Sequence, residues 1–281
     1  MTGSSLRDPD VARTFLFVPG DRPDRFERAA ASGTEQVIVD LEDAVDPESK
    51  DIARDHARRW LTSAGRGVVR INAAQSPWFD ADCAALAGLG GLDAVMVPKS
   101  EDPARLTALS HAFGPTVRII ALVESARGID AAARIAAADG VSRLAFGSID
   151  LAADLGCDHT RDALLLARST LVLASRSAGI APPIDGVTTD LDDLEVISDD
   201  ARYSRSLGFR GKLCIHPKQL AATVSAFMPT ATEFAWAERV LAASSGDGAV
   251  RVDGEMVDRP VLERARRIVN EARATNSPEE S

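Results

Sequence analysis

The segment VRIIALVESARGIDAAARIAAADGVSRLAF (117–146) contains a strand, a helix and a second strand, and this order decides the fold. VRIIALV (117–123) and SRLAF (142–146) are short apolar runs rich in β-forming residues, and residues 127–138 between them have helical spacing. Asp139-Gly140 ends that helix, because glycine readily takes the left-handed conformation at a helix C-terminus. The segment therefore predicts one β-α-β unit.

The same alternation extends in both directions from this unit. Six more strand candidates occur, of which the last two are weaker: TFLFV (14–18), QVIVD (36–40), GVVRI (67–71), DAVMV (93–97), IAPPI (180–184) and KLCI (212–215). Residues between them have helical spacing, at 22–31, 48–61, 103–113, 163–178 and 190–207. Continuous Val, Ile and Leu runs are typical of parallel strands buried on both faces by helices.

Eight such units in 281 residues predict an α/β fold of the (β/α)₈ TIM-barrel type. An open doubly wound sheet is the alternative, but the Gly-x-Gly-x-x-Gly fingerprint is absent after the first strand. We predict that the barrel occupies residues 1–225. Helical spacing at 233–243 and 261–274 predicts a C-terminal helical extension over residues 226–281.

The composition limits the classes of function. A net charge of -10 and a pI near 5.0 argue against sequence-independent binding to nucleic acid or to an anionic membrane, since both need clustered Lys and Arg. No apolar leader and no run of about eighteen apolar residues occurs, so we expect a cytoplasmic protein. Three widely spaced cysteines indicate reduced thiols.

Polar residues follow every predicted strand, at the end where a TIM barrel carries its chemistry. In chain order they include Asp21, Asp40, Arg70, Lys99, Glu124, Asp150, Asp185 and His216. Strand ends are also where polar loops begin, which is an ordinary explanation for any single residue. Polar residues at the ends of all eight predicted strands together favour a functional site.

Glu124 and Asp150 follow two neighbouring strands, so we expect their carboxylates to lie close together at the barrel mouth. Two buried like charges need a shared proton or a cation, and hard oxygen donors suit Mg²⁺. Asp40, Glu42 and Asp43 are candidates to hold metal-bound waters or to fix Arg70. Their alternative role is to stabilise the dipole of the helix that follows.

Two basic residues at strand ends are further candidates. The guanidinium of Arg70 is always charged and can bind a carboxylate or a developing enolate oxygen. Its alternative role is only to balance the negative charge of the acidic residues at the strand ends. Lys99 can form a Schiff base in a metal-independent aldolase, but acidic neighbours would keep it an unreactive ammonium. We rank this chemistry second.

Together these motifs resemble the citrate lyase β-subunit-like group of the HpcH/HpaI aldolase and citrate lyase family. The resemblance is carried by FLFVPGDRPDRF (15–26), VDLEDAV (39–45), VRIN (69–72), VPKS (97–100), ALVESARGI (121–129), FGSIDLAADLG (146–156), PIDGV (183–187), GFRGKLCIHPKQ (208–219) and GEMVDRPVLERA (254–265). Ile149 departs from the pattern, because many relatives carry an acidic residue before the metal aspartate.

The resemblance implies a magnesium-dependent carbon-carbon lyase that acts on a short carboxylated β-hydroxyacyl-CoA, such as malyl-, citramalyl- or hydroxymethylglutaryl-CoA. It implies Mg²⁺ ligands at Glu124 and Asp150. Candidate catalytic residues are Arg70, Asp258, Glu42 and Asp43, and candidates for substrate or CoA binding are Gly20, Arg22, Arg25, Arg70, Lys99, Lys212 and His216.

The resemblance also implies a homotrimer or hexamer, in which the C-terminal extension contacts a neighbouring subunit and Asp258 reaches that subunit's site. Two rivals stay open: a non-catalytic acyl-CoA-binding or complex subunit, and the Schiff-base aldolase. The exact thioester is beyond the sequence, since one methyl or carboxyl group shifts binding by only about 1–3 kcal/mol.

Overall fold

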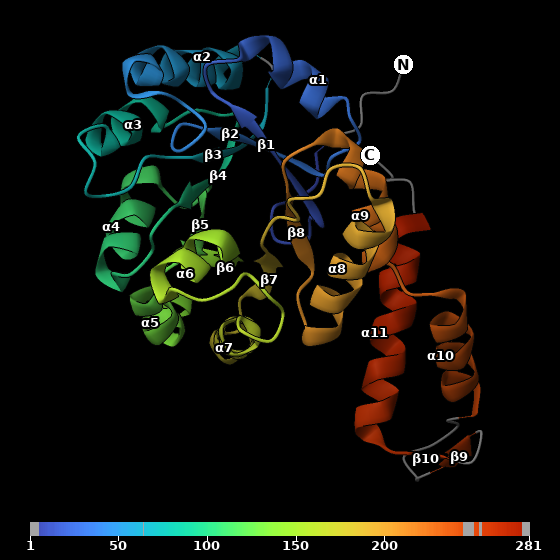
Figure 1. The fold of residues 1–281 in the computed structure, drawn as a ribbon. Helices are drawn as coiled ribbons and strands as arrows, with labels where there is room; N and C mark the ends of the chain where they lie inside the picture. Colours follow the sequence, from blue (N-terminus) through green and yellow to red (C-terminus); the bar gives the residue numbers. More distant parts are fainter. Residues whose placement is uncertain (1–5, 64, 244–249, 253–254, 277–281) are drawn as a thin grey trace. The chain divides into compact units, whose positions relative to one another are not determined.

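The computed structural model describes residues 6–63, 65–243, 250–252 and 255–276 (Figure 1). The chain divides into two compact units, Met1–Val224 and Ser225–Ser281. The first unit contains a barrel and the second contains helices with a short strand pair.

Eight parallel strands close into one barrel in chain order, and β8 pairs back onto β1. The strands are β1 (Thr14–Pro19), β2 (Gln36–Asp40), β3 (Gly67–Arg70), β4 (Leu92–Val97), β5 (Arg118–Val123), β6 (Val141–Phe146), β7 (Ala181–Asp185) and β8 (Gly211–Cys214). This closure confirms the predicted TIM barrel and excludes the open sheet.

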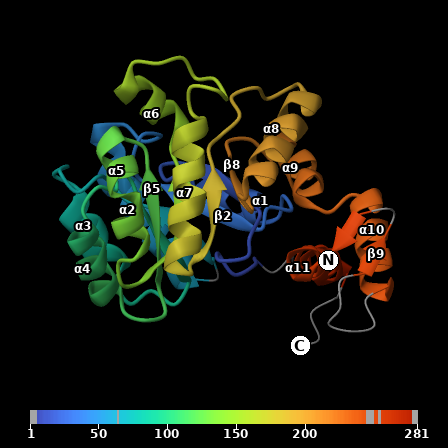
Figure 2. The ribbon, with the colours of Figure 1, turned by 90° about the horizontal axis from the view of Figure 1, so that it is seen from below.

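Helices lie outside the strands, as the two views in Figures 1 and 2 show. In the barrel unit they are α1 (Phe26–Ala30), α2 (Lys50–Ser63), α3 (Phe79–Leu86), α4 (Pro103–Phe113), α5 (Ala126–Ala136), α6 (Ser148–Leu155), α7 (Leu165–Ala178) and α8 (Leu194–Leu207), with α9 (Leu220–Phe227) across its boundary. Short 3₁₀ turns precede three of them, at Pro23–Arg25, Pro47–Ser49 and Pro217–Gln219. The helices α3, α6 and α9 lie outside the predictions, because eight residues are too few for a clear helical period.

The prolines of β7 explain why this strand is the weakest signal in the sequence. Pro182 and Pro183 have no backbone N–H, and the register between β6 and β7 shifts across them. β7 still ends beside β8, with Asp185 opposite Lys212. β7 is therefore held in the sheet by closure of the barrel, although its prolines disfavour strand pairing.

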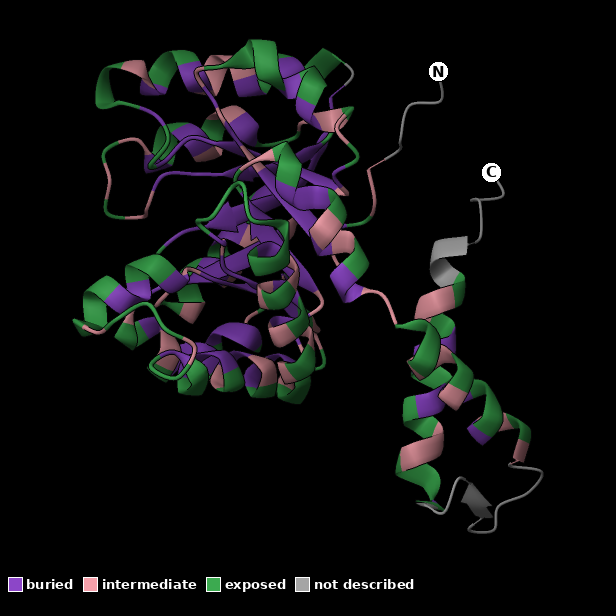
Figure 3. Ribbon diagram, turned by 45° about the vertical axis from the view of Figure 1, so that its right-hand side comes forward, coloured by how far each residue is buried: buried purple, intermediate pink, exposed green. Residues whose placement is uncertain are grey.

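The barrel interior is filled by alternate residues of the strands. The strands are coloured as largely buried in Figure 3, because helices cover their outer face. Phe15, Ile38, Val68, Met96, Ile120, Leu122, Ala145, Ile184 and Leu213 belong to this core. At the opposite end from the strand C-termini, the fully buried Arg143 donates to the carbonyls of Pro9, Ala12 and Pro182. The N-terminal segment thereby closes the lower end of the barrel.

The second unit contains α10 (Ala231–Ala243), α11 (Arg259–Asn276) and the antiparallel strands β9 (Val250–Val252) and β10 (Glu255–Val257). Its own apolar cluster includes Ala237, Val240 and Ile268. None of the helices in the described ranges combines the length and apolar character that a membrane crossing needs.

Candidate functional site

A cavity of about 320 Å³ lies at the carboxyl ends of the barrel strands. Its polar lining comes from residues that end or follow β2, β3, β5 and β6, namely Asp40, Asp43, Arg70, Glu124, Ser148 and Asp150. Much of the remaining lining is apolar and includes Phe17, Ile149 and Val187. The structure thus brings together the predicted metal ligands and the predicted substrate arginine.

Arg70 is fixed in this cavity by a two-pronged ion pair. Asp40 lies opposite it in the register of β2 and β3, and both Arg70 Nε and Nη2 donate to the Asp40 carboxylate at 2.7 Å. Its third nitrogen, Nη1, lies 3.2 Å from both Glu42 and Asp43. Burial alone would lower the pKa of Arg70, but these carboxylates raise it above its ordinary value. Arg70 is therefore a permanent, oriented cation.

The acidic loop after β2 is held by a buried lysine that the sequence analysis does not single out. Lys50, in the first turn of α2, donates from Nζ to the carbonyls of Leu41 at 2.8 Å and Glu42 at 2.6 Å. The Asp40 carboxylate accepts from the backbone of Glu42 and Ala44 in the same loop. These bonds fix the position of Glu42 beside Arg70. No local sequence pattern marks Lys50, because its acceptors are main-chain atoms.

Glu42 is buried between two cations. Its Oε1 accepts from Lys99 Nζ at 2.9 Å. Its Oε2 has no hydrogen-bond donor among the described residues and lies 3.2 Å from Arg70. Burial raises the pKa of Glu42, and the charge of Arg70 only partly opposes this effect. Glu42 can therefore exchange a proton closer to neutral pH than an ordinary glutamate does.

Glu124 follows β5 and is only 4% exposed. Its Oε1 accepts from the backbone N–H of Lys99 at 2.8 Å. A Cβ placed on Gly147 would lie 2.5 Å from its Oε2, so glycine is required there for the carboxylate to fit. Burial, with the nearby charge of Glu42, raises the pKa of Glu124 to about 8.

Asp150, in the first turn of α6, is exposed at the same cavity. We expected two buried carboxylates, whereas the structure pairs a buried Glu124 with an exposed Asp150. The charge of Asp150 contributes to the raised pKa of Glu124. In the described part of the chain, no hydrogen bond or ion pair engages the Asp150 carboxylate.

These two carboxylates fit a magnesium ion. The described residues contain no cluster of three or more His, Cys, Asp or Glu side chains that would form a closed metal site. Mg²⁺ typically takes one or two carboxylates and completes its shell with water and substrate oxygens. Burial and the charges of Glu42 and Asp150 raise the pKa of Glu124, and a cation held by Glu124 and Asp150 would offset this repulsion.

We predict that Mg²⁺ binding to this site strengthens with pH. Below a pKa of about 8, Glu124 holds a proton that the cation must displace. The Mg²⁺ affinity should therefore rise about tenfold per pH unit from pH 6 to 7 and level off above pH 8. Isothermal titration calorimetry in two buffers of different ionisation enthalpy will count the released proton. An affinity that is constant from pH 6 to 8 would contradict this.

Lys99 is unsuited to Schiff-base chemistry. Burial lowers the pKa of its ammonium, but the bond with Glu42 and the charges of Glu42 and Glu124 outweigh that effect and raise it. The amine is therefore protonated, as the sequence analysis expects.

A second cavity, of about 640 Å³, adjoins the first along β1 and β8. Arg25, Arg28 and His216 line it together with apolar side chains. The two cavities share Phe17, Ala44 and Ile215. An extended molecule can therefore occupy both.

The other predicted CoA contacts have different positions. Gly20 is buried, and a Cβ there would lie 2.8 Å from the Asp40 carbonyl. Arg22 is exposed and pairs with Asp24 at 3.2 Å. Neither residue lines the second cavity.

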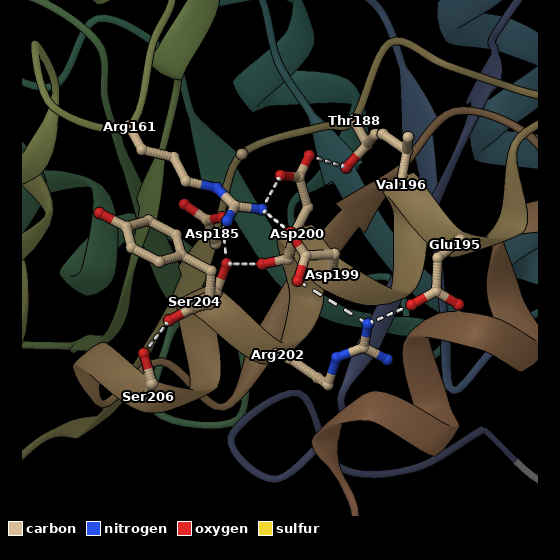
Figure 4. Close-up of polar contacts among 12 residues, drawn as sticks. Arg161, Asp185, Thr188, Glu195, Val196, Asp199, Asp200, Arg202, Ser204 and Ser206 are labelled. Carbon is tan, nitrogen blue, oxygen red and sulfur yellow. Dashed lines mark hydrogen bonds and ion pairs between the residues drawn. The ribbon is translucent and has the colours of Figure 1, made fainter.

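Lys212 does not fit the expected phosphate contact. It is 2% exposed, and its Nζ donates to Asp185 and to the Gly186 carbonyl. Asp185 also accepts from Arg168 and from Ser204, the latter labelled in Figure 4. Lys212 therefore belongs to a buried ion cluster outside both cavities.

Asp258 lies in the second unit, immediately before α11. It is exposed, and its carboxylate accepts from the backbone N–H of Val261 at 3.2 Å. Within one chain it therefore has the position of a helix cap.

Residues 13–217 match the family model described as HpcH/HpaI aldolase/citrate lyase. The citrate lyase subunit beta-like protein of Mycobacterium tuberculosis is 40% identical over 266 residues, which cover 92% of this chain and 94% of that protein. The (3S)-malyl-CoA thioesterase of Cereibacter sphaeroides is 33% identical over 273 residues, covering 93% and 95%.

Among solved structures, protein CitE of Mycobacterium tuberculosis in complex with magnesium, acetoacetate and coenzyme A is similar to this chain. The TM-score is 0.84 at 40% sequence identity, and the match covers 94% of this chain and 99% of that one.

Proposed function

The chain belongs to the HpcH/HpaI aldolase/citrate lyase family, and we propose that it is a magnesium-dependent lyase of short carboxylated β-hydroxyacyl-CoA thioesters. Citramalyl-, malyl- and hydroxymethylglutaryl-CoA are the candidate substrates, and acetyl-CoA or another acyl-CoA with a keto acid or ketone are the products. The observation that carries the proposal is the cavity that brings the buried Glu124 together with Asp150 and the fixed Arg70. A similar structure holds magnesium, acetoacetate and coenzyme A.

Glu124 and Asp150 would hold the cation, which acts when bound as a Lewis acid on the keto-acid part of the substrate. Arg70 would act on the acyl-CoA part of the substrate. Cleavage leaves negative charge on the thioester oxygen, and a cation already oriented by Asp40 stabilises that charge without further reorganisation.

Two proton transfers accompany cleavage. One group takes the proton of the β-hydroxyl as the carbon-carbon bond breaks, and another protonates the enolate carbon. Glu42 suits one transfer because burial raises its pKa, and Asp43 lies beside it on Arg70. We assign the other transfer to Asp258 of a neighbouring copy in a homotrimer or hexamer.

The second cavity is the proposed binding site for CoA. Arg25, Arg28 and His216 offer positive or hydrogen-bonding groups to its phosphates. The pantetheine chain can then pass Phe17 and Ile215 toward the metal site. Lys212 is left out of this assignment because it is buried with Asp185.

The test is a substrate panel. We expect the purified protein to release acetyl-CoA from at least one of malyl-, citramalyl- and hydroxymethylglutaryl-CoA with Mg²⁺, and to release none with EDTA, as measured by mass spectrometry. Stabilisation by CoA without turnover would favour a non-catalytic subunit. A borohydride-trapped adduct on Lys99 with turnover in EDTA would favour the Schiff-base aldolase.

A further inference from the structure

Lys99, two residues after β4, has an unusual backbone conformation. Its φ is 48°, and in the described ranges it is the only residue other than glycine with a positive φ. Every residue other than glycine is strained in this left-handed region, because its Cβ approaches the backbone too closely. Such strain persists only where neighbouring contacts stabilise the conformation. Here the next residue provides the hold: Ser100 N donates to the Leu122 carbonyl at 3.1 Å, and Ser100 Oγ donates to the Val97 carbonyl at 2.8 Å.

In this conformation, the backbone N–H and the ammonium group of Lys99 each donate to a different carboxylate. The backbone N–H of Lys99 donates to Glu124 Oε1 at 2.8 Å, and its Nζ donates to Glu42 Oε1 at 2.9 Å. Glu124 follows β5 whereas Glu42 follows β2, so Lys99 links carboxylates that follow two separate strands of the barrel. Because φ is the rotation between a residue's N–H and its side chain, an ordinary φ would change the angle between these two donors of Lys99.

The Glu124 carboxylate is thereby fixed from two directions. Lys99 N holds Oε1, and the absence of a side chain at Gly147 leaves just enough room for Oε2. We infer that Lys99 is a positioning residue, whose left-handed main chain presets the Glu124 carboxylate for the cation. This inference rests on the proposed function, in which Glu124 is a metal ligand.

The test separates the main chain of Lys99 from its ammonium. Lys99→Gly, Lys99→Ala and Lys99→Val all remove the charge and all keep the N–H. They differ in how readily they adopt a positive φ: glycine does so freely, alanine with difficulty and β-branched valine with most difficulty. Lys99→Asn is a fourth variant, since asparagine tolerates this region.

We expect the Mg²⁺ dissociation constant, measured by calorimetry, to rise from Gly through Ala to Val. Because Gly and Ala differ in the left-handed region by roughly a factor of five or more in population, the Ala variant should bind Mg²⁺ about fivefold more weakly than the Gly variant. The Asn variant should fall between them. If the Val variant does not fold, the comparison of Gly with Ala decides the question.

Melting temperatures in EDTA provide the control for a merely structural role. Equal Mg²⁺ affinities across the series, with melting temperatures that differ, would overturn the inference and leave the proposed function intact. Failure of the wild-type protein itself to bind Mg²⁺ would overturn both.

Discussion

Glu124→Gln is expected to reduce turnover of the thioester by about 10³-fold or more, because the loss of a metal ligand removes several kcal/mol of transition-state stabilisation. The amide keeps the shape of the side chain and cannot carry the negative charge. The Mg²⁺ affinity should fall with the turnover. Calorimetry and the acetyl-CoA assay measure the two effects on one preparation.

The same variant should fold normally. At pH 7 the metal-free Glu124 is already largely neutral, since its pKa is about 8, so a neutral amide changes the metal-free protein little. We therefore expect an unchanged melting temperature in EDTA and no rise on addition of Mg²⁺. Glu48→Gln, at an exposed glutamate outside the cavities, is the matched control and should leave both properties as in the wild type.

Subunit mixing extends this experiment to Asp258. If Asp258 acts on a neighbouring copy, a mixture of Glu124→Gln and Asp258→Asn subunits contains sites with both groups intact. Random exchange should restore up to about a quarter of the wild-type activity. A mixture no more active than its components would contradict the assignment of Asp258 to a neighbouring subunit, and full turnover by Glu124→Gln would contradict the metal site itself.

The sequence is sufficient to predict the barrel because alternating strands and helices are local patterns. It also leads to Arg70, Glu124 and Asp150, since residues at the carboxyl ends of barrel strands share one face of the molecule. Lys50 and the backbone of Lys99 are different. Their partners are carbonyl and carboxylate groups from other strands, which become neighbours only when the barrel closes.

The position of Lys212 follows from the alternation of side chains along a strand. Side chains of a strand alternate between the barrel interior and the helices outside it. Leu213 and Ile184 face the interior, so their chain neighbours Lys212 and Asp185 face outward. This alternation, counted from the interior Leu213, places Lys212 on the outer face of β8 and away from the CoA cavity.

Asp185→Asn is expected to lower the free energy of unfolding by about 3–5 kcal/mol, because it leaves buried cations without their shared anion. Asp185 is 1% exposed and accepts from Arg168 at 2.9 Å and from Lys212 at 3.3 Å. Burial raises the pKa of Asp185, but Lys212 and Arg168 outweigh it and hold the pKa below its ordinary value of 3.8. A carboxylate with a lowered pKa stabilises the folded state above that ordinary value, so the full loss should appear at neutral pH.

Urea denaturation of the metal-free protein measures this loss. Asp199→Asn is the matched control, because Asp199 is an exposed aspartate of the same region that pairs with Arg161 at 2.7 Å (Figure 4). An exposed pair contributes only about 0–1 kcal/mol, so the control should unfold almost as the wild type does. Mg²⁺ affinity should be unchanged in both variants, because neither aspartate lines the metal cavity. Equal stability of the two variants would show that Lys212 and Arg168 do not need Asp185, and the cluster would then have to be neutralised by another group.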